Sequence, residues 1–126
     1  MKYRELYKVA QKAMENAYAP FSKFKVGTAL LVVTGEVFTG VNVENSSFGA
    51  TICAEQTAFV KAISEGERAF EAIAICSSDG SAWPCGICRQ VMMEFCDSKF
   101  LIVTGDDEDN LQWYKLSEML PEGFKL

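Results

Sequence analysis

No histidine occurs in this sequence, and that absence removes several kinds of chemistry at once. A Ser-His-Asp triad, a Cys-His pair and a histidine general base are all excluded. Any metal site must be built from other donors, and the sequence offers five cysteines for this purpose. Any proton carrier must likewise be another side chain, such as a carboxylate close to a metal ligand.

Long apolar runs and clusters of basic residues are missing too. No apolar run approaches the length that a bilayer span requires, and the N-terminus lacks the apolar core of a signal peptide. The twelve lysines and arginines are scattered and the formal net charge is −5, which argues against a polynucleotide partner. We therefore expect no membrane and no nucleic-acid partner, and a cytoplasmic protein with reduced thiols.

No internal repeat or low-complexity linker divides the chain, so we expect residues 1–126 to form a single domain. Apolar residues recur at helical spacing in the first segment and form short strand-like runs further on. The pattern predicts helices over 3–18, 51–65 and 86–95, a helical turn over 117–120, and strands over 25–33, 37–43, 72–77, 100–104 and 111–115.

This order of elements predicts an α/β fold with a five-stranded mixed sheet. The first two strands form an antiparallel hairpin, and the last two pair in the same way because their connection is short. Two right-handed strand–helix–strand crossovers place their helices on one face. The first helix is expected on the other face, which makes a three-layer α-β-α arrangement.

Two short cysteine-containing pieces stand where apolar segments turn into helical patterns. They are Cys53-Ala54-Glu55 and the run from Pro84 to Cys88. Both helices start at the carboxyl ends of preceding strands, where open α/β sheets place their sites. We therefore expect Cys53, Glu55, Cys85 and Cys88 to lie together, with the helix N-termini favouring thiolates.

Three thiols with an open fourth position are typical of catalytic zinc. Cys96 lies too far along the same predicted helix to join Cys88, about 12 Å away at the usual helical rise. Cys76 lies in an apolar run and is interpreted as a buried core thiol. A redox pair or a structural metal site with an unidentified fourth ligand would also contain a CxxC motif. A redox pair, however, leaves Cys53 and Glu55 unexplained.

Three motifs give the chain a resemblance to the small homotetrameric cytidine deaminases. They are residues 42–45 (NVEN), 53–55 (CAE) and 84–90 (PCGICRQ), and the likeness runs from residues 18–22 (YAPFS) to residues 120–124 (LPEGF). The resemblance implies a cytidine-deaminase-like fold, one zinc ion per subunit and a homotetramer. It also implies hydrolytic deamination of cytidine and 2'-deoxycytidine to uridine and 2'-deoxyuridine plus ammonia, a step of pyrimidine salvage.

The resemblance also implies roles for single residues. Cys53, Cys85 and Cys88 bind zinc, zinc-activated hydroxide attacks C4 of the base, and Glu55 carries the protons. The substrate-binding residues are Asn42 and Glu44 at the sugar, Phe24 and Ala54 near the base, and Phe124 reaching a neighbouring subunit's site. Without the zinc motif, residues 42 and 44 would be interpreted as a solvated turn and Phe24 as a core aromatic.

Gln56 departs from the family pattern, which has arginine after Cys-Ala-Glu. That arginine would offset the charge of the zinc-bound thiolates, so we expect its loss to disfavour hydroxide on the metal. Arg89 is a poor substitute, because relatives carry an arginine there as well. Two other functions stay open: deamination of another aminopyrimidine nucleoside such as blasticidin S, and an inactive zinc-stabilised binding module. The residues 42–45 favour an ordinary nucleoside.

Overall fold

A five-stranded mixed sheet forms the middle of the molecule, in the order β2-β1-β3-β4-β5. The computed structural model describes residues 2–126. The β3 and β4 strands pair in parallel, and the other neighbours pair antiparallel. The predicted antiparallel pairs, β1 with β2 and β4 with β5, are confirmed. The strands are β1 (Val26–Val32), β2 (Val37–Val41), β3 (Phe70–Ser77), β4 (Leu101–Gly105) and β5 (Leu111–Lys115).

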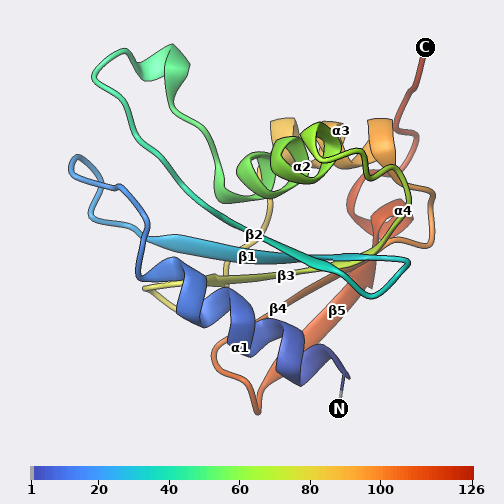
Figure 1. Ribbon diagram of the computed structural model, residues 1–126, viewed down its shortest axis with the longest axis horizontal. Helices are drawn as coiled ribbons and strands as arrows, with labels where there is room; N and C mark the ends of the chain where they lie inside the picture. The colour runs from blue at the N-terminus through green and yellow to red at the C-terminus, as the bar shows by residue number, and fades with distance from the viewer. Residues whose placement is uncertain (1) are drawn as a thin grey trace.

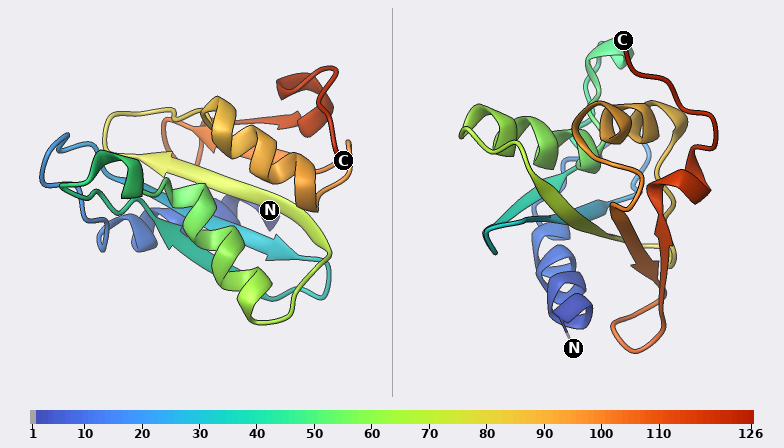
Figure 2. Two further views of the ribbon diagram at one scale, coloured as in Figure 1. Left: turned by 90° about the horizontal axis from the view of Figure 1, so that it is seen from above. Right: turned by 90° about the vertical axis from the view of Figure 1, so that its right-hand side faces the viewer.

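Helices cover both faces of this sheet, which confirms the predicted layers. Figure 1 shows α1 on one face and the crossover helices α2 and α3 on the other. The left-hand view in Figure 2, seen from above, shows α2 and α3 lying side by side over the strands. The helices are α1 (Lys2–Met14), α2 (Ala54–Ser64), α3 (Gly86–Phe95) and α4 (Leu116–Met119), with a short 3-10 helix at Phe48–Ala50.

Separate hydrophobic clusters hold the two helical layers onto the sheet. On the α1 face, Leu6, Tyr7 and Ala10 pack against strand residues. On the other face Phe59 of α2 contacts the rings of Phe95 on α3 and of Phe100, at centroid distances of 6.2 and 5.9 Å. Burying one such ring contributes roughly 1.5–3 kcal/mol. Phe59 therefore fixes the two crossover helices relative to each other.

The main difference from the sequence-based expectation lies after α1. The helix was expected to reach residue 18, but it ends at Met14. Tyr18 instead pairs with the segment that follows β2: its N–H donates to Asn42 O at 3.0 Å, and its carbonyl accepts from Glu44 N at 2.8 Å. These hydrogen bonds replace the last helical turn. They also bring the segment before β1 against residues 42–44.

None of the helices within residues 2–126 combines the length and the hydropathy needed to cross a lipid bilayer.

Candidate active site and metal centre

The N-termini of α2 and α3 meet over the sheet and carry the cysteines. Cys53 is the N-cap residue of α2 and Cys85 that of α3, both in extended conformation, while Cys88 lies in the first turn of α3. The three Sγ atoms all lie within 4.8 Å of one another. The Cys85 and Cys88 sulfurs are 3.5 Å apart. The predicted proximity of these three thiols is therefore confirmed.

This donor set fits zinc. Tetrahedral zinc with Zn–S bonds of about 2.3 Å places its sulfurs about 3.8 Å apart, which matches the observed spacing. Within residues 2–126 no other cysteine or carboxylate joins the cluster. Cys76 and Cys96 are buried elsewhere, as expected. Three protein ligands leave a fourth position for water or substrate, as in catalytic zinc sites.

The Cys53 and Cys88 thiols differ in acidity. A hydrogen bond with Cys88 lowers the pKa of Cys53 to about 6. The same bond, together with burial, raises the pKa of Cys88. Cys53 therefore becomes a thiolate before Cys88, and it does so at the N-terminus of a helix, where negative charge is favoured.

Glu55 lies two residues beyond Cys53 and is almost completely buried, with 6% of its surface exposed. Burial raises the pKa of Glu55 to about 7, and the negative charge of Cys53 acts in the same direction. A carboxyl group with a pKa near the working pH can both accept and donate a proton. A pKa of about 7 for Glu55 is compatible with the predicted role of proton carrier.

One cavity of about 430 Å³ joins the cysteines to the polar residues after β2. Four of the five predicted substrate-binding residues line it: Phe24, Asn42, Glu44 and Ala54. Glu55, Cys53 and Cys85 form part of the same wall. The cavity has room for a nucleoside-sized ligand.

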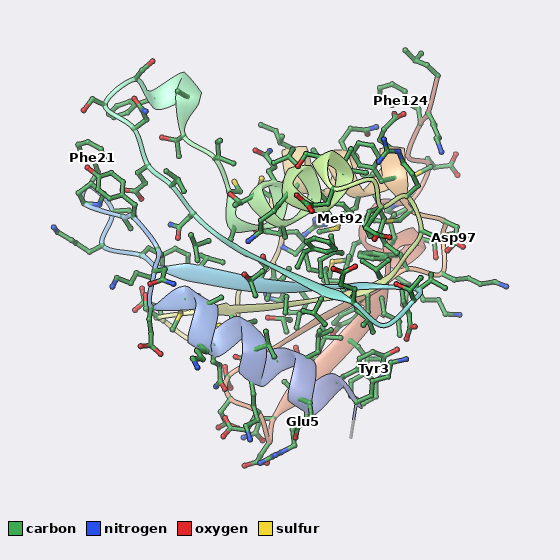
Figure 3. All side chains as sticks on the ribbon, in the orientation of Figure 1. Tyr3, Glu5, Phe21, Met92, Asp97 and Phe124 are labelled. Carbon is green, nitrogen blue, oxygen red and sulfur yellow. The ribbon has the colours of Figure 1, made fainter. Side chains whose placement is uncertain are left out.

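Phe124 does not line this cavity. Its side chain is 65% exposed, and Figure 3 shows it near the C-terminus, on the opposite side of the molecule from Phe21. Its carbonyl accepts a hydrogen bond from the Gln90 side chain at 3.0 Å. Within one chain, Phe124 is therefore outside the site. Gln56 is half-buried and is also absent from the cavity wall.

Sequence reasoning missed a second group of wall residues. Trp83 stands directly before Pro84 and Cys85, and this adjacency was a signal that could have identified it. The others belong to strands and loops and carry no distinctive chemistry, so no pattern marked them. The wall includes Thr51, Ile52, Ile75, Ser81, Ala82 and Trp83.

Asn42 fixes the position of the segment that carries Phe24. Its Oδ1 accepts from Val26 N at 2.9 Å, and its Nδ2 donates to Phe24 O at 2.8 Å. The Asn42 amide therefore bridges the two sides of residue 25. One amide hydrogen and one oxygen lone pair remain for another partner.

Glu44 holds the preceding turn. Its Oε1 accepts from Phe21 N at 2.9 Å and Ser22 N at 3.1 Å, and its Oε2 accepts from the Ser22 hydroxyl. Hydrogen bonds from Ser22 and Phe21 hold the pKa of Glu44 below its ordinary value. Glu44 is thus a carboxylate at the mouth of the cavity, already oriented by the loop that it stabilises.

Two threonines anchor the start of α2 to the sheet. The buried Thr28 hydroxyl lies 3.0 Å from Ala54 O and 3.2 Å from Gly40 O. Thr57 Oγ1 donates to Val41 O at 2.9 Å. These bonds tie the helical turn that carries Glu55 to the adjacent strands β1 and β2.

Arg89 is engaged away from the sulfurs. Its Nε donates to Pro84 O and another guanidinium nitrogen donates to Met119 O, both at 2.8 Å. The side chain therefore ties the turn before Cys85 to the end of α4. This arrangement agrees with the expectation that Arg89 does not replace the arginine missing at position 56.

Three clustered thiols and a buried glutamate, at adjacent helix N-termini over a mixed sheet, define a zinc-dependent nucleobase deaminase site. The sequence model of the family described as "Cytidine and deoxycytidylate deaminase zinc-binding region" matches residues 1–104. The chain therefore belongs to the cytidine deaminase family.

Two cytidine deaminases of known sequence match this chain along almost their whole length. The cytidine deaminase of Sporosarcina psychrophila is 41% identical over 125 residues, 98% of this chain and 92% of that protein. That of Halalkalibacterium halodurans is 46% identical over 120 residues, covering 94% and 91%. The crystal structure of cytidine deaminase from Burkholderia pseudomallei has a TM-score of 0.92 at 41% identity and covers 98% and 100% of the two chains. The predicted fold is thereby confirmed.

Proposed function

We propose that the chain hydrolyses cytidine and 2'-deoxycytidine to uridine and 2'-deoxyuridine plus ammonia. Residues 1–126 form the catalytic domain, and Cys53, Cys85 and Cys88 hold one zinc ion per subunit. The observation that carries the proposal is the shared cavity wall, on which two of the three clustered thiols lie beside buried Glu55. Three thiolate ligands also require a reducing compartment, which supports action in the cytoplasm.

Zinc held by Cys53, Cys85 and Cys88 would supply a Lewis acid that makes water nucleophilic at neutral pH. Glu55 would accept the two protons of the water in turn, and would deliver one to ring N3 and the other to the leaving amine. Its pKa of about 7 suits both directions of transfer. The reaction balances as one nucleoside and one water giving one uracil nucleoside and one ammonia.

Phe24 and Ala54 contact the base, and Asn42 and Glu44 contact the sugar in this proposal. A carboxylate and an amide suit hydroxyl groups, which both donate and accept. The described cavity wall contains no lysine or arginine. A nucleotide phosphate would therefore meet the Glu44 carboxylate without a compensating cation, so CMP is expected to be a poor substrate.

A panel of substrates tests the function. Purified protein is analysed for zinc and then given cytidine, deoxycytidine, cytosine, CMP, blasticidin S and single-stranded DNA in parallel, with absorbance and ammonia as readouts. Cytidine and deoxycytidine should react, and cytosine should be poor because sugar contacts contribute to transition-state binding. Fast turnover of CMP or single-stranded DNA contradicts the proposal. Preference for blasticidin S assigns another substrate, and zinc binding without turnover identifies a binding module.

The assembly proposed is a homotetramer in which Phe124 reaches a neighbouring subunit's site. Phe21, Phe48 and Phe124 are 54%, 80% and 65% exposed in the single chain, and burial of such rings in an assembly is favourable. Light scattering at micromolar concentration should give about four times the chain mass of 13.9 kDa. A stable and fully active monomer would disprove this assembly.

A further inference from the structure

Thr104, near the end of β4, is completely buried and does not line the cavity. Its hydroxyl oxygen accepts from Ala82 N at 3.2 Å, and the hydroxyl donates to Ala82 O at 2.8 Å. One side chain therefore satisfies both main-chain polar groups of residue 82. In a sheet, the C=O and N–H groups of a neighbouring strand would form these two hydrogen bonds.

Ala82 lies in the segment 81–83, which belongs to no helix or strand and forms the cavity wall just before Cys85. Two further contacts come from the same region of the sheet. The Ser81 hydroxyl donates to Asp106 Oδ1 at 3.0 Å, and the Trp83 ring packs edge-on against Tyr114 at 5.3 Å between centroids. Asp106, which follows β4, and Tyr114, on the neighbouring strand β5, therefore help to hold this part of the cavity wall in place.

Loss of the Thr104 hydroxyl would leave a buried N–H and a buried C=O without partners. An unsatisfied buried pair is costly, so the segment shifts or admits water instead. Ser81 is half-buried, and its hydrogen bond to Asp106 is exposed to solvent and therefore a weak substitute. The position of the wall therefore depends chiefly on Thr104.

We propose that Thr104 is a positioning residue for the deamination. It holds the segment 81–83 at the cavity wall beside Cys85, although it does not itself line the cavity. The proposal rests on the proposed function for its kinetic consequence. Its structural consequence, a displaced segment 81–83, is independent of that function.

The test compares two substitutions at position 104 with a matched control. Thr104→Val removes the hydroxyl at nearly constant shape, and Thr104→Ser keeps it. Tyr7→Phe is the control, because the Tyr7 hydroxyl donates to Gly105 O at 2.9 Å, is equally buried, and reaches the next residue of β4 from α1 on the other face. Thr104→Ala is the second variant in case the valine protein does not fold.

Kinetics and fluorescence provide the two readouts. Trp83 is isolated by Trp113→Phe, since the chain has two tryptophans, and its accessibility is measured by acrylamide quenching of the zinc-loaded protein. Thr104→Val should raise quenching and KM for cytidine, and lower kcat/KM by about 10-fold to 100-fold, the effect of a misplacement of about 1 Å. Thr104→Ser should stay within about threefold of wild type because it retains the hydrogen-bonding group. Tyr7→Phe should lower the melting temperature without changing KM or quenching.

Every result of these measurements either supports or overturns the proposed role of Thr104. Wild-type KM and quenching in Thr104→Val overturn the proposal, as does a Tyr7→Phe protein with the same kinetic change. If Thr104→Val does not fold, wild-type KM and quenching in Thr104→Ala overturn it in the same way. A wild-type protein that does not deaminate cytidine refutes the proposed function, whereas the change in Trp83 quenching still tests the position of segment 81–83.

Discussion

Gly40 of β2 lies directly against the main chain of Ala54 at the start of α2. A Cβ added to Gly40 would lie 2.3 Å from Ala54 O and 2.6 Å from Ala58 N. Only glycine permits so close an approach of helix to strand. Because Ala54 stands between Cys53 and Glu55, the distance between α2 and β2 also determines where these two side chains lie.

Gly40→Ala is therefore expected to lift the N-terminus of α2 away from the sheet. The overpacked contact should destabilise the fold by about 1–3 kcal/mol, and the displaced Cys53 should release zinc more readily to a chelator. Denaturant unfolding and chelator competition measure the two effects. Gly49→Ala is the matched control, because nothing lies within 4 Å of its added Cβ. Equal losses in the two variants would show that the Gly40 contact has no special role.

Glu55→Gln is expected to separate zinc binding from turnover. The amide keeps the shape of the side chain but cannot carry protons, so kcat should fall by about 10²–10⁴ or more while zinc content stays at wild-type level. Atomic absorption and steady-state kinetics are the measurements. The control is Glu65→Gln, an exposed position at the end of the same helix. Wild-type turnover would remove Glu55 from the proposed role, and loss of zinc would identify it as a ligand.

The buried carboxyl of Glu55 also predicts a pH-dependent stability of the zinc-free, reduced protein. Its pKa of about 7 in the folded chain lies above the ordinary value of 4.5. Between these two values the unfolded chain releases the proton and the folded chain retains it, so rising pH favours unfolding. The protonated Glu55 carboxyl stabilises the folded state by up to about 3 kcal/mol. This stabilisation is fully present below the ordinary pKa of 4.5 and is lost as the pH rises through about 7.

Glu55→Gln removes that dependence, since glutamine does not ionise. Relative to wild type, the zinc-free variant should be stabilised at about pH 8 and nearly unchanged at about pH 5. Urea unfolding at both pH values, in the presence of a phosphine reductant, gives the comparison. A stability difference that is the same at both pH values would mean that Glu55 ionises normally in the folded chain.

Local patterns in the sequence were enough to predict the order of the elements and the clustered thiols. Hydrophobic periodicity identifies buried strands and helices, and the crossover rule then places Cys53 and Cys85 together. The helix was overextended past Met14 because residues 15–18 keep an acceptable helical pattern. The actual partners of Tyr18, Asn42 and Glu44, lie more than twenty residues away, and such pairing leaves no local signal.

The hydrogen bonds among the residues of the site could not be predicted from the sequence for the same reason. A motif predicts that Asn42 and Glu44 bind the sugar, but their hydrogen bonds to the segment that carries Phe24 depend on tertiary contacts. Thr104 is a threonine in an apolar strand, a common combination with no distinguishing pattern. Only its position opposite Ala82 gives it a role.

Gln56 is the N3 residue of α2, three positions after the N-cap residue Cys53. Side chains at N3 commonly reach back to the N-cap residue. An arginine at this position would therefore come close to the Cys53 sulfur. Arg89 is bound to carbonyl oxygens, and within residues 2–126 no arginine is hydrogen-bonded to a cysteine sulfur.

Gln56→Arg is accordingly expected to make the site more resistant to acid. A guanidinium beside thiolates favours their charged form and lowers their pKa, by about half a unit to one unit for a half-buried pair. Because zinc is released when its ligands are protonated, the pH of half release should fall by a similar amount. The acidic limb of the kcat–pH profile should shift in the same direction at equal zinc occupancy. Gln56→Met, similar in length and neutral, is the control. Unchanged release and an unchanged or raised acidic limb would mean that another donor already compensates the sulfurs, and that position 56 does not limit the acidity of the site.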